Sequence, residues 1–168
     1  MDTILWKIFD SVDSLVRYAE GKNIHILTFL GLQLTAVRFI SIHLNPWFEV
    51  CVVFLGAAVL LSVVSFLPKS RFTGWLYHLS RVSSKPGAGD NTLYYGDIVK
   101  YSVDGYIEAM EKSLACKIRG NSYHENLCRQ IVVNAGIAND KFRLFKLSFG
   151  VMLIGELFFA ISLFDKIR

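Results

Sequence analysis

Two long apolar runs separated by a short turn are the feature that most constrains the fold. Residues 24–44 and 48–67 consist mainly of aliphatic and aromatic side chains, and Pro46 lies at the centre of the turn between them. A helix needs about 20 apolar residues to cross the ~30 Å hydrocarbon core of a bilayer. Because both runs reach that length, we predict a transmembrane helical hairpin over residues 24–67.

A third apolar run lies close to the C-terminus. Residues 147–164 span roughly 27 Å as a helix, at 1.5 Å per residue. The residues before them, from Tyr123 onward, carry apolar side chains at three- and four-residue steps, which is typical of an amphipathic helix. We therefore predict one long helix over residues 123–164, whose last part forms a third crossing within a segment covering residues 147–168.

The other segments are predicted to be helical as well. Residues 1–23 form an amphipathic helix that either lies at the membrane surface or packs on neighbouring helices, and residues 20–23 lead from it into the first crossing. Residues 68–146 are predicted to form a cytosolic helical segment, with a short interfacial helix over residues 71–82 and a later helix capped by Ser102. The chain is therefore predicted to be an all-α membrane protein.

Positive charges indicate the orientation. The net charge is +4, and twelve of the 18 Lys and Arg residues lie between residues 69 and 146, whereas the turn at residues 45–47 has none. Because cytoplasmic loops carry an excess of Lys and Arg, the N-terminus and the middle segment are predicted to be cytoplasmic and the short tail to lie outside. The basic residues are scattered, which favours the lipid bilayer over a nucleic acid polymer as partner.

The sequence contains no motif typical of catalysis or of metal or cofactor binding. Its three cysteines, Cys51, Cys116 and Cys128, are dispersed, which indicates reduced thiols in a protein facing the cytosol. The four histidines lie in separate segments, and none of the common nucleotide-binding, hydrolase or metalloprotease signatures occurs. We therefore expect no enzyme and no cofactor. Two classes stay open: a membrane effector or channel-like protein, and a structural or accessory membrane subunit.

Three polar residues inside the apolar runs are candidates for gating contacts. Counted at 1.5 Å per residue from the inner ends of the crossings, Gln33 and Glu156 lie roughly 14 Å deep and Arg38 roughly 21 Å deep. Charged groups at such depth are costly and usually functional. We hypothesise that Glu156 bonds to Gln33 or Arg38, within one subunit or between subunits. The alternative is that Arg38 extends outward and Glu156 stays protonated against a neighbouring group.

Three stretches together resemble one protein family. They are VRYAEGKNIHILTFLG at residues 16–31, NTLYYGDIVKYSVDGYIEAM at residues 91–110, and ENLCRQIVVNAGIANDKFRLFKLSFGVMLIG at residues 125–155. In this order they are similar to segments of the Pycsar effectors with transmembrane helices, the PycTM family. The resemblance implies a bacterial anti-phage effector that responds to cyclic CMP or cyclic UMP from a pyrimidine cyclase. It also implies a multi-pass inner-membrane protein that impairs the membrane and stops growth, and we expect a homo-oligomer.

The resemblance also implies candidate residues for binding the nucleotide. The family pattern falls on Lys22, Asn23, Asn91, Tyr95, Gly96, Tyr106, Gln130, Asn134 and Lys141. Tyr95 is suited to stack on a base. Lys22 or Lys141 would bind a phosphate, and Asn91 or Asn134 would contact a base edge. The alternative roles are structural: Asn91 caps a turn, Gly96 supplies a positive φ, and the tyrosines pack on the helices. Ligand binding would shift the packing of the membrane helices through the long last helix.

Overall fold

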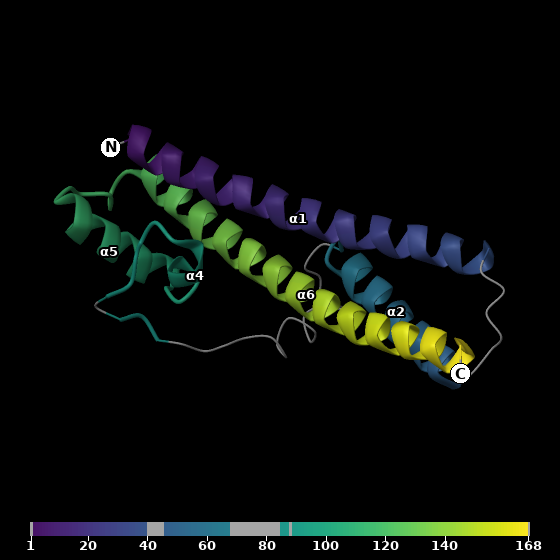
Figure 1. Cartoon of the computed structure of the whole chain (residues 1–168). Helices are drawn as coiled ribbons and strands as arrows, with labels where there is room; N and C mark the ends of the chain where they lie inside the picture. Colours follow the sequence, from purple (N-terminus) through teal and green to yellow (C-terminus); the bar gives the residue numbers. More distant parts are fainter. Residues whose placement is uncertain (1, 40–45, 68–84, 88, 168) are drawn as a thin grey trace. The chain divides into compact units, whose positions relative to one another are not determined.

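The computed structural model describes residues 2–39, 46–67, 85–87 and 89–167, and these ranges contain helices and turns but no strand (Figure 1). The predicted all-α membrane fold is confirmed. The interfacial helix expected at residues 71–82 lies outside the described ranges. The helices are α1 (Asp2–Phe39), α2 (Pro46–Val64), α4 (Tyr95–Ile98), α5 (Val103–Leu114) and α6 (Ser122–Ile167).

Two of the described helices are long and apolar enough to cross a membrane. They are α2, over Pro46–Val64, and α6, over Ser122–Asp165. The second half of α1 is not among them, and only residues 24–39 of the predicted first crossing belong to its described part. A crossing by residues 24–44 therefore stays a prediction, and its last residues lie beyond the described part of α1.

The sequence predicted an amphipathic helix over residues 1–23, with residues 20–23 connecting it to the first crossing. Helix α1 differs from this prediction. It continues without a break from Asp2 to Phe39. No proline interrupts it, and each of its two glycines, Gly21 and Gly31, costs a helix only about 1 kcal/mol relative to Ala. Packing on both sides of Gly21 offsets the cost there, since Ala19 and Asn23 are fully buried.

Helix α2 begins two residues earlier than the predicted second crossing, because Pro46 and Trp47 belong to it. Proline is favoured in the first turn of a helix, where its missing N–H has no intrahelical partner in any case. At the other end the helix closes in a turn, in which the N–H groups of Phe66 and Leu67 donate to the carbonyls of Val63 and Val64. The regular helix therefore covers Pro46–Val64 rather than residues 48–67.

The predicted cap at Ser102 and the long last helix are both present. Ser102 Oγ accepts a hydrogen bond from the N–H of Gly105 at 3.1 Å. Helix α5 ends at Ala115, which adopts a left-handed conformation with φ 49°. After the connecting loop, α6 runs as one helix of 46 residues over Ser122–Ile167. It contains the whole of the predicted range.

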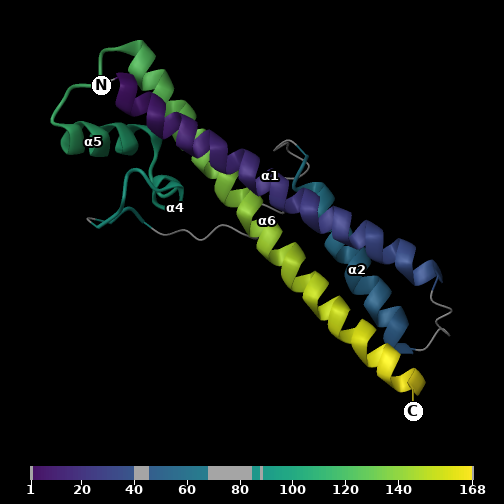
Figure 2. The ribbon, with the colours of Figure 1, turned by 45° about the horizontal axis from the view of Figure 1, so that its top comes forward.

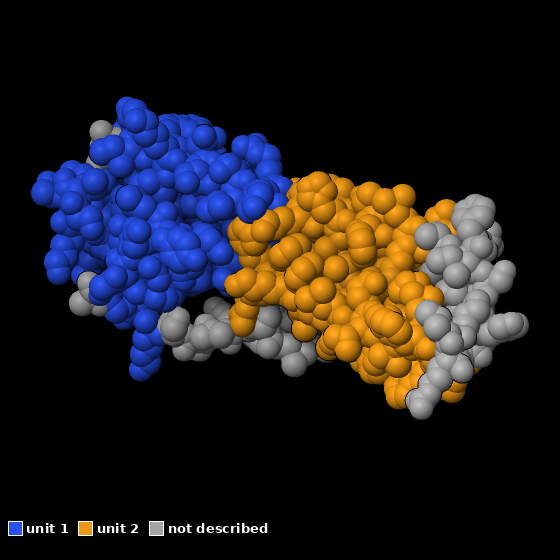
Figure 3. Space-filling model, in the orientation of Figure 1, with its two compact units in different colours: residues 1–19, 76–141 blue, residues 20–75, 142–168 orange. Residues whose placement is uncertain are grey.

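Contacts divide the chain into two units, which Figure 3 shows in different colours. Unit 1 comprises Met1–Ala19 and Leu76–Lys141, and unit 2 comprises Glu20–Trp75 and Phe142–Arg168. Each unit therefore joins segments that are distant in the sequence, and α1 and α6 each contribute residues to both units.

Each unit has its own apolar core. In unit 1 the start of α1 packs with α4, α5 and the start of α6, and the buried side chains are Leu5, Ile8, Val12, Ile98, Tyr106, Ile107, Met110, Ile118, Leu127, Cys128, Ile131 and Ala135. The apolar face of the N-terminal amphipathic segment is therefore packed on neighbouring helices. In unit 2 the two views show α2 beside α6 (Figures 1 and 2), and the core is Ile26, Leu30, Cys51, Leu55, Ala58 and Met152.

Candidate functional site

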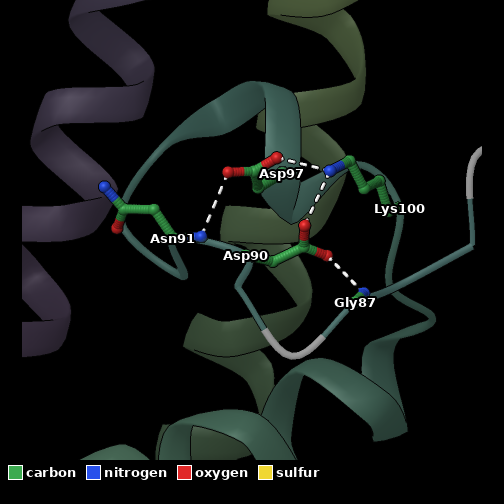
Figure 4. A network of polar contacts seen from close by, with 5 residues as sticks. All are labelled: Gly87, Asp90, Asn91, Asp97 and Lys100. Atoms are coloured by element: carbon green, nitrogen blue, oxygen red, sulfur yellow. Dashed lines mark hydrogen bonds and ion pairs between the residues drawn. The ribbon is translucent and has the colours of Figure 1, made fainter.

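A network of charged residues organises the turn that precedes α5 in unit 1. The ammonium of Lys100 lies 2.7 Å from Asp90 and 2.6 Å from Asp97 (Figure 4). Asp90 also accepts a hydrogen bond from the N–H of Gly87, and Asp97 accepts one from the N–H of Asn91. We call these five residues the Lys100 network. They tie both ends of the turn together.

Charge pairing in the Lys100 network makes it unsuited to bind a phosphate. Hydrogen bonds from Lys100 and from the Asn91 N–H hold the pKa of Asp97 below its usual value, and the pKa of Asp90 is lowered in the same way by Lys100 and Gly87. The two carboxylates in turn raise the pKa of Lys100. With two negative charges around one positive charge, the network has a net negative charge and repels anions. Its role is to stabilise the conformation of the turn.

Asn91 and Gly96 have structural roles within this turn. Asn91 Oδ1 accepts a hydrogen bond from the N–H of Leu93 at 2.9 Å, which is the turn cap considered as an alternative. The expectation of a positive φ at Gly96 is wrong: among the described glycines, Gly120 has one, at 92°. A Cβ at Gly96 would lie 2.6 Å from the ring of Tyr94, so a larger residue there would displace this ring.

Three tyrosines of this region differ in burial. Tyr95 packs partly against the unit 1 core, and burial together with its hydrogen bond to Tyr94 raises its pKa to about 12. Tyr106 is fully buried and donates a hydrogen bond to the carbonyl of Thr92 at 3.1 Å. Tyr94 is 51% exposed, with its ring centroid 4.9 Å from that of Tyr95. The ring best placed to meet a ligand is therefore Tyr94, which the sequence analysis missed.

The other candidate ligand residues fall into two groups. Gln130, Asn134 and Lys141 belong to the part of α6 that lies in unit 1, and their spacing of four and seven residues places them along one side of the helix. Gln130 is exposed and the other two are partly buried. Lys22 and Asn23 belong to unit 2, where Asn23 is fully buried. The structure therefore gathers Asn91, Tyr95 and Gly96 in one turn, and does not unite all the candidates in one cluster.

Polar contacts in unit 2 connect the membrane helices. Gln33 Nε2 donates a hydrogen bond to Glu156 Oε2 at 3.0 Å, as the depth calculation predicted for these two residues. The Oε1 atoms of both side chains are buried and have no hydrogen-bond partner among the described residues. The side chain of Arg38, the other expected partner, lies outside the described part of the chain.

A second polar contact in unit 2 was missed by the sequence analysis. The hydroxyls of Ser62 and Ser148 lie 2.7 Å apart, and Ser148 donates to the carbonyl of Ala58 at 2.8 Å. Both serines are fully buried. The sequence feature that could have predicted this contact is a serine within each apolar run, since serine hydroxyls in membranes usually form hydrogen bonds between helices.

Comparison with known proteins identifies the family. The family model of the Pycsar effector protein domain matches residues 4–164. The chain belongs to this family. A curated member, the Pycsar effector protein RsPycTM of a Rhizobium species, is 28% identical over 165 residues, with 88% of this chain and 89% of the relative covered. No solved structure matches the chain significantly.

Membership confirms the resemblance seen in the sequence. This PycTM chain is an anti-phage effector of cyclic-nucleotide signalling and a membrane protein. Among the described residues, no group of three His, Cys, Asp or Glu side chains is arranged to hold a metal ion. The features that bear on an effector role are the exposed aromatic turn of unit 1 and the polar contacts between the membrane helices of unit 2.

Proposed function

We propose that this protein disrupts the bacterial inner membrane when a cyclic pyrimidine mononucleotide, cCMP or cUMP, binds to it. In this proposal it is a multi-pass homo-oligomer with a cytoplasmic N-terminus and middle segment, and its activation causes growth arrest or cell death. Membership of the Pycsar effector family and the two apolar helices support this proposal. A ligand made in the cytosol would reach the middle segment, where most of the basic residues lie.

The observation that carries the proposal is the course of α1 and α6. Each of these helices contributes residues to both units. Unit 1 contains most of the candidate nucleotide residues, and unit 2 contains the polar contacts between apolar helices. A ligand that binds one packing state of unit 1 better than another shifts the population toward that state. The two continuous helices connect that shift covalently to unit 2.

In this proposal, the change in membrane packing begins at the contact between Gln33 and Glu156. Each side chain keeps one buried oxygen without a partner among the described residues. Polar groups in hydrocarbon are stable only when they are paired or face water. A rearrangement that brings water or a second subunit to these oxygens would therefore be favourable, and it would open the packing of unit 2.

The nucleotide is assigned to unit 1, with Tyr94 added to the residues expected from the sequence. Its exposed ring can stack on the pyrimidine, a contact worth about 1–3 kcal/mol per base. Lys100 is excluded as the phosphate ligand because two carboxylates neutralise it. Of the two lysines expected from the sequence, Lys141 belongs to unit 1 and is therefore the candidate for the phosphate, whereas Lys22 belongs to unit 2. Gln130 and Asn134 are the candidates for polar contacts to the base.

Membrane integrity in a bacterial host tests the function. The chain is expressed with an active pyrimidine cyclase, with an inactive cyclase, and alone, and propidium entry and a potential-sensitive dye are followed. We expect permeabilisation with the active cyclase and intact membranes in the other two cultures. Damage in all three cultures would contradict nucleotide gating. Intact membranes in all three would favour a structural or accessory membrane subunit without a nucleotide ligand.

Calorimetric titration of the purified full chain with cCMP or cUMP tests the assignment to unit 1. Tyr94→Ala is expected to weaken binding by about 5- to 150-fold, which corresponds to the loss of one stacking contact. Leu93→Ala is the matched control, since Leu93 is a similarly exposed neighbour without a π face. Equal affinity of the two variants would contradict the role of Tyr94.

A further inference from the structure

A groove between α1 and α6 in unit 2 has no role in the proposed function. Its volume is about 390 Å³. Five apolar side chains line it, and Lys22 and His25 complete the lining. The apolar residues are Ile26, Phe29, Phe145, Phe149 and Met152. The groove therefore combines an apolar surface with cationic and imidazole groups.

The polar groups of the groove are gathered at one end. Lys22 Nζ lies 5.1 Å from the centroid of the Phe145 ring, which places these two residues at the same level. From there the lining extends along α1 to Phe29 and along α6 to Met152, in each case about 10 Å at 1.5 Å per residue. Phe145 and Phe149 stack with centroids 5.9 Å apart and form part of the apolar wall. The groove thus runs from a basic end to an apolar end.

The basic end coincides with the start of the predicted first crossing. Lys22 lies two residues before Ile24, the first residue of that apolar run. In the predicted three-crossing topology, the groove begins where lipid headgroups meet the hydrocarbon core and continues along the apolar parts of both helices. Basic pockets between membrane helices on the cytoplasmic side bind anionic lipid headgroups.

We propose that this groove binds an anionic phospholipid, with one acyl chain along the apolar wall and the phosphate at Lys22 and His25. A lysine ammonium offers three hydrogen-bond donors to phosphate oxygens. An acyl chain has no hydrogen-bonding groups and can therefore pack against the phenylalanine and methionine side chains. A cyclic nucleotide fits this groove poorly, because the edges of its base and ribose would be buried against apolar side chains without hydrogen bonds. The lipid site does not depend on nucleotide activation.

Native mass spectrometry of the full chain in detergent micelles tests this site. Phosphatidylglycerol or phosphatidylcholine is titrated in, and the fraction of lipid-bound protein is measured. We expect preferential retention of phosphatidylglycerol. Lys22→Gln should weaken it about fivefold, which corresponds to ~1 kcal/mol for one basic side chain near the membrane. Phe149→Ala should weaken it as well, since it removes part of the apolar wall.

Matched variants separate the groove from general charge and hydrophobicity. Lys146→Gln and Phe164→Ala change exposed residues of α6 that do not line the groove, and both should bind phosphatidylglycerol like the wild type. Lys22→Arg keeps the cation and should retain most of the binding, and circular dichroism verifies that every variant is folded. Equal retention of phosphatidylcholine, or equal binding by Lys22→Gln and Lys146→Gln, would overturn the proposal. Displacement of the lipid by cCMP or cUMP would also overturn it and assign the groove to the nucleotide.

Discussion

At the residue scale, Lys100 is held between Asp90 and Asp97 at 2.7 and 2.6 Å. A lysine on a polar turn of a nucleotide-responsive protein is an obvious candidate for phosphate binding, and the sequence contains no feature that excludes it. Its partners do exclude it, because they are two carboxylates that have further hydrogen bonds to backbone N–H groups. Lys100 therefore contributes to the stability of unit 1 rather than to ligand affinity.

The Lys100 network predicts an acid-dependent loss of stability. The pKa of Asp97 is lower in the folded state than in the unfolded chain, because Lys100 and the Asn91 N–H donate to its carboxylate. Its stabilising effect is therefore complete above the unfolded pKa of ~3.9 and is lost as the pH falls through the lower folded pKa. We expect the unfolding temperature of the wild type to fall as the pH is lowered from about 4 toward 2, and Asp97→Asn to show a smaller fall.

Circular dichroism melts of the purified chain across this pH range measure the effect. Asp10→Asn is the control, since Asp10 is an exposed acid of α1 and the change should leave the acid dependence of the wild type intact. A fall of the same size in wild type and Asp97→Asn would show that the Lys100 network does not contribute to acid sensitivity.

At the scale of the elements, Gly155 determines how closely α6 approaches α2. A Cβ at this position would lie 2.8 Å from Leu55 Cδ2 and 3.3 Å from Phe54 Cβ. At Gly150, earlier on the same helix, a Cβ would meet no atom within 4 Å. Small residues allow membrane helices to pack closely, and here one glycine of α6 has that role and the other does not.

This difference predicts opposite outcomes for two alanine substitutions. Gly155→Ala should destabilise unit 2 by about 1–3 kcal/mol, the usual cost of inserting a methyl group into a packed interface. Gly150→Ala should raise stability, by at most about 1 kcal/mol, since alanine is the better helix former and its methyl group meets no atom there. Denaturant unfolding of the detergent-solubilised protein, followed by circular dichroism, measures both. Equal stability of the two variants would contradict the close approach at Gly155.

At the scale of the whole molecule, the number of crossings decides the position of the C-terminal tail. Helices α2 and α6 have the length and composition of membrane spans, whereas the second half of α1 carries more polar residues. If α1 crosses, the turn at residues 45–47 and the tail both lie outside. If it does not cross, the tail returns to the side of the N-terminus.

Reporter fusions measure this topology directly. Alkaline phosphatase, which is active only outside the cytoplasm, is fused after residue 46, residue 100 or the last residue. We expect activity at residue 46 and at the C-terminus, and none at residue 100, because residues 69–146 carry most of the positive charge. An inactive C-terminal fusion would contradict the three-crossing prediction. Activity at residue 100 would contradict the orientation.

The sequence alone determined the features that depend on local geometry. Apolar run length predicted the membrane helices, and Ser102 predicted its helix start, because a cap bonds to a backbone N–H only three residues away. The contact between Gln33 and Glu156 was predictable from depth, since every helical residue adds the same 1.5 Å. The family resemblance came from residue order and required no structure.

Only the tertiary structure decided which side chains from distant segments meet. The burial of Tyr95 and the exposure of Tyr94 depend on how their turn packs on the unit 1 core. Ser62 and Ser148 are 86 residues apart, and the groove at Lys22 needs side chains from both α1 and α6. Such contacts follow from the rotation of one helix against another, which the packing of many side chains sets together and which no local sequence pattern specifies.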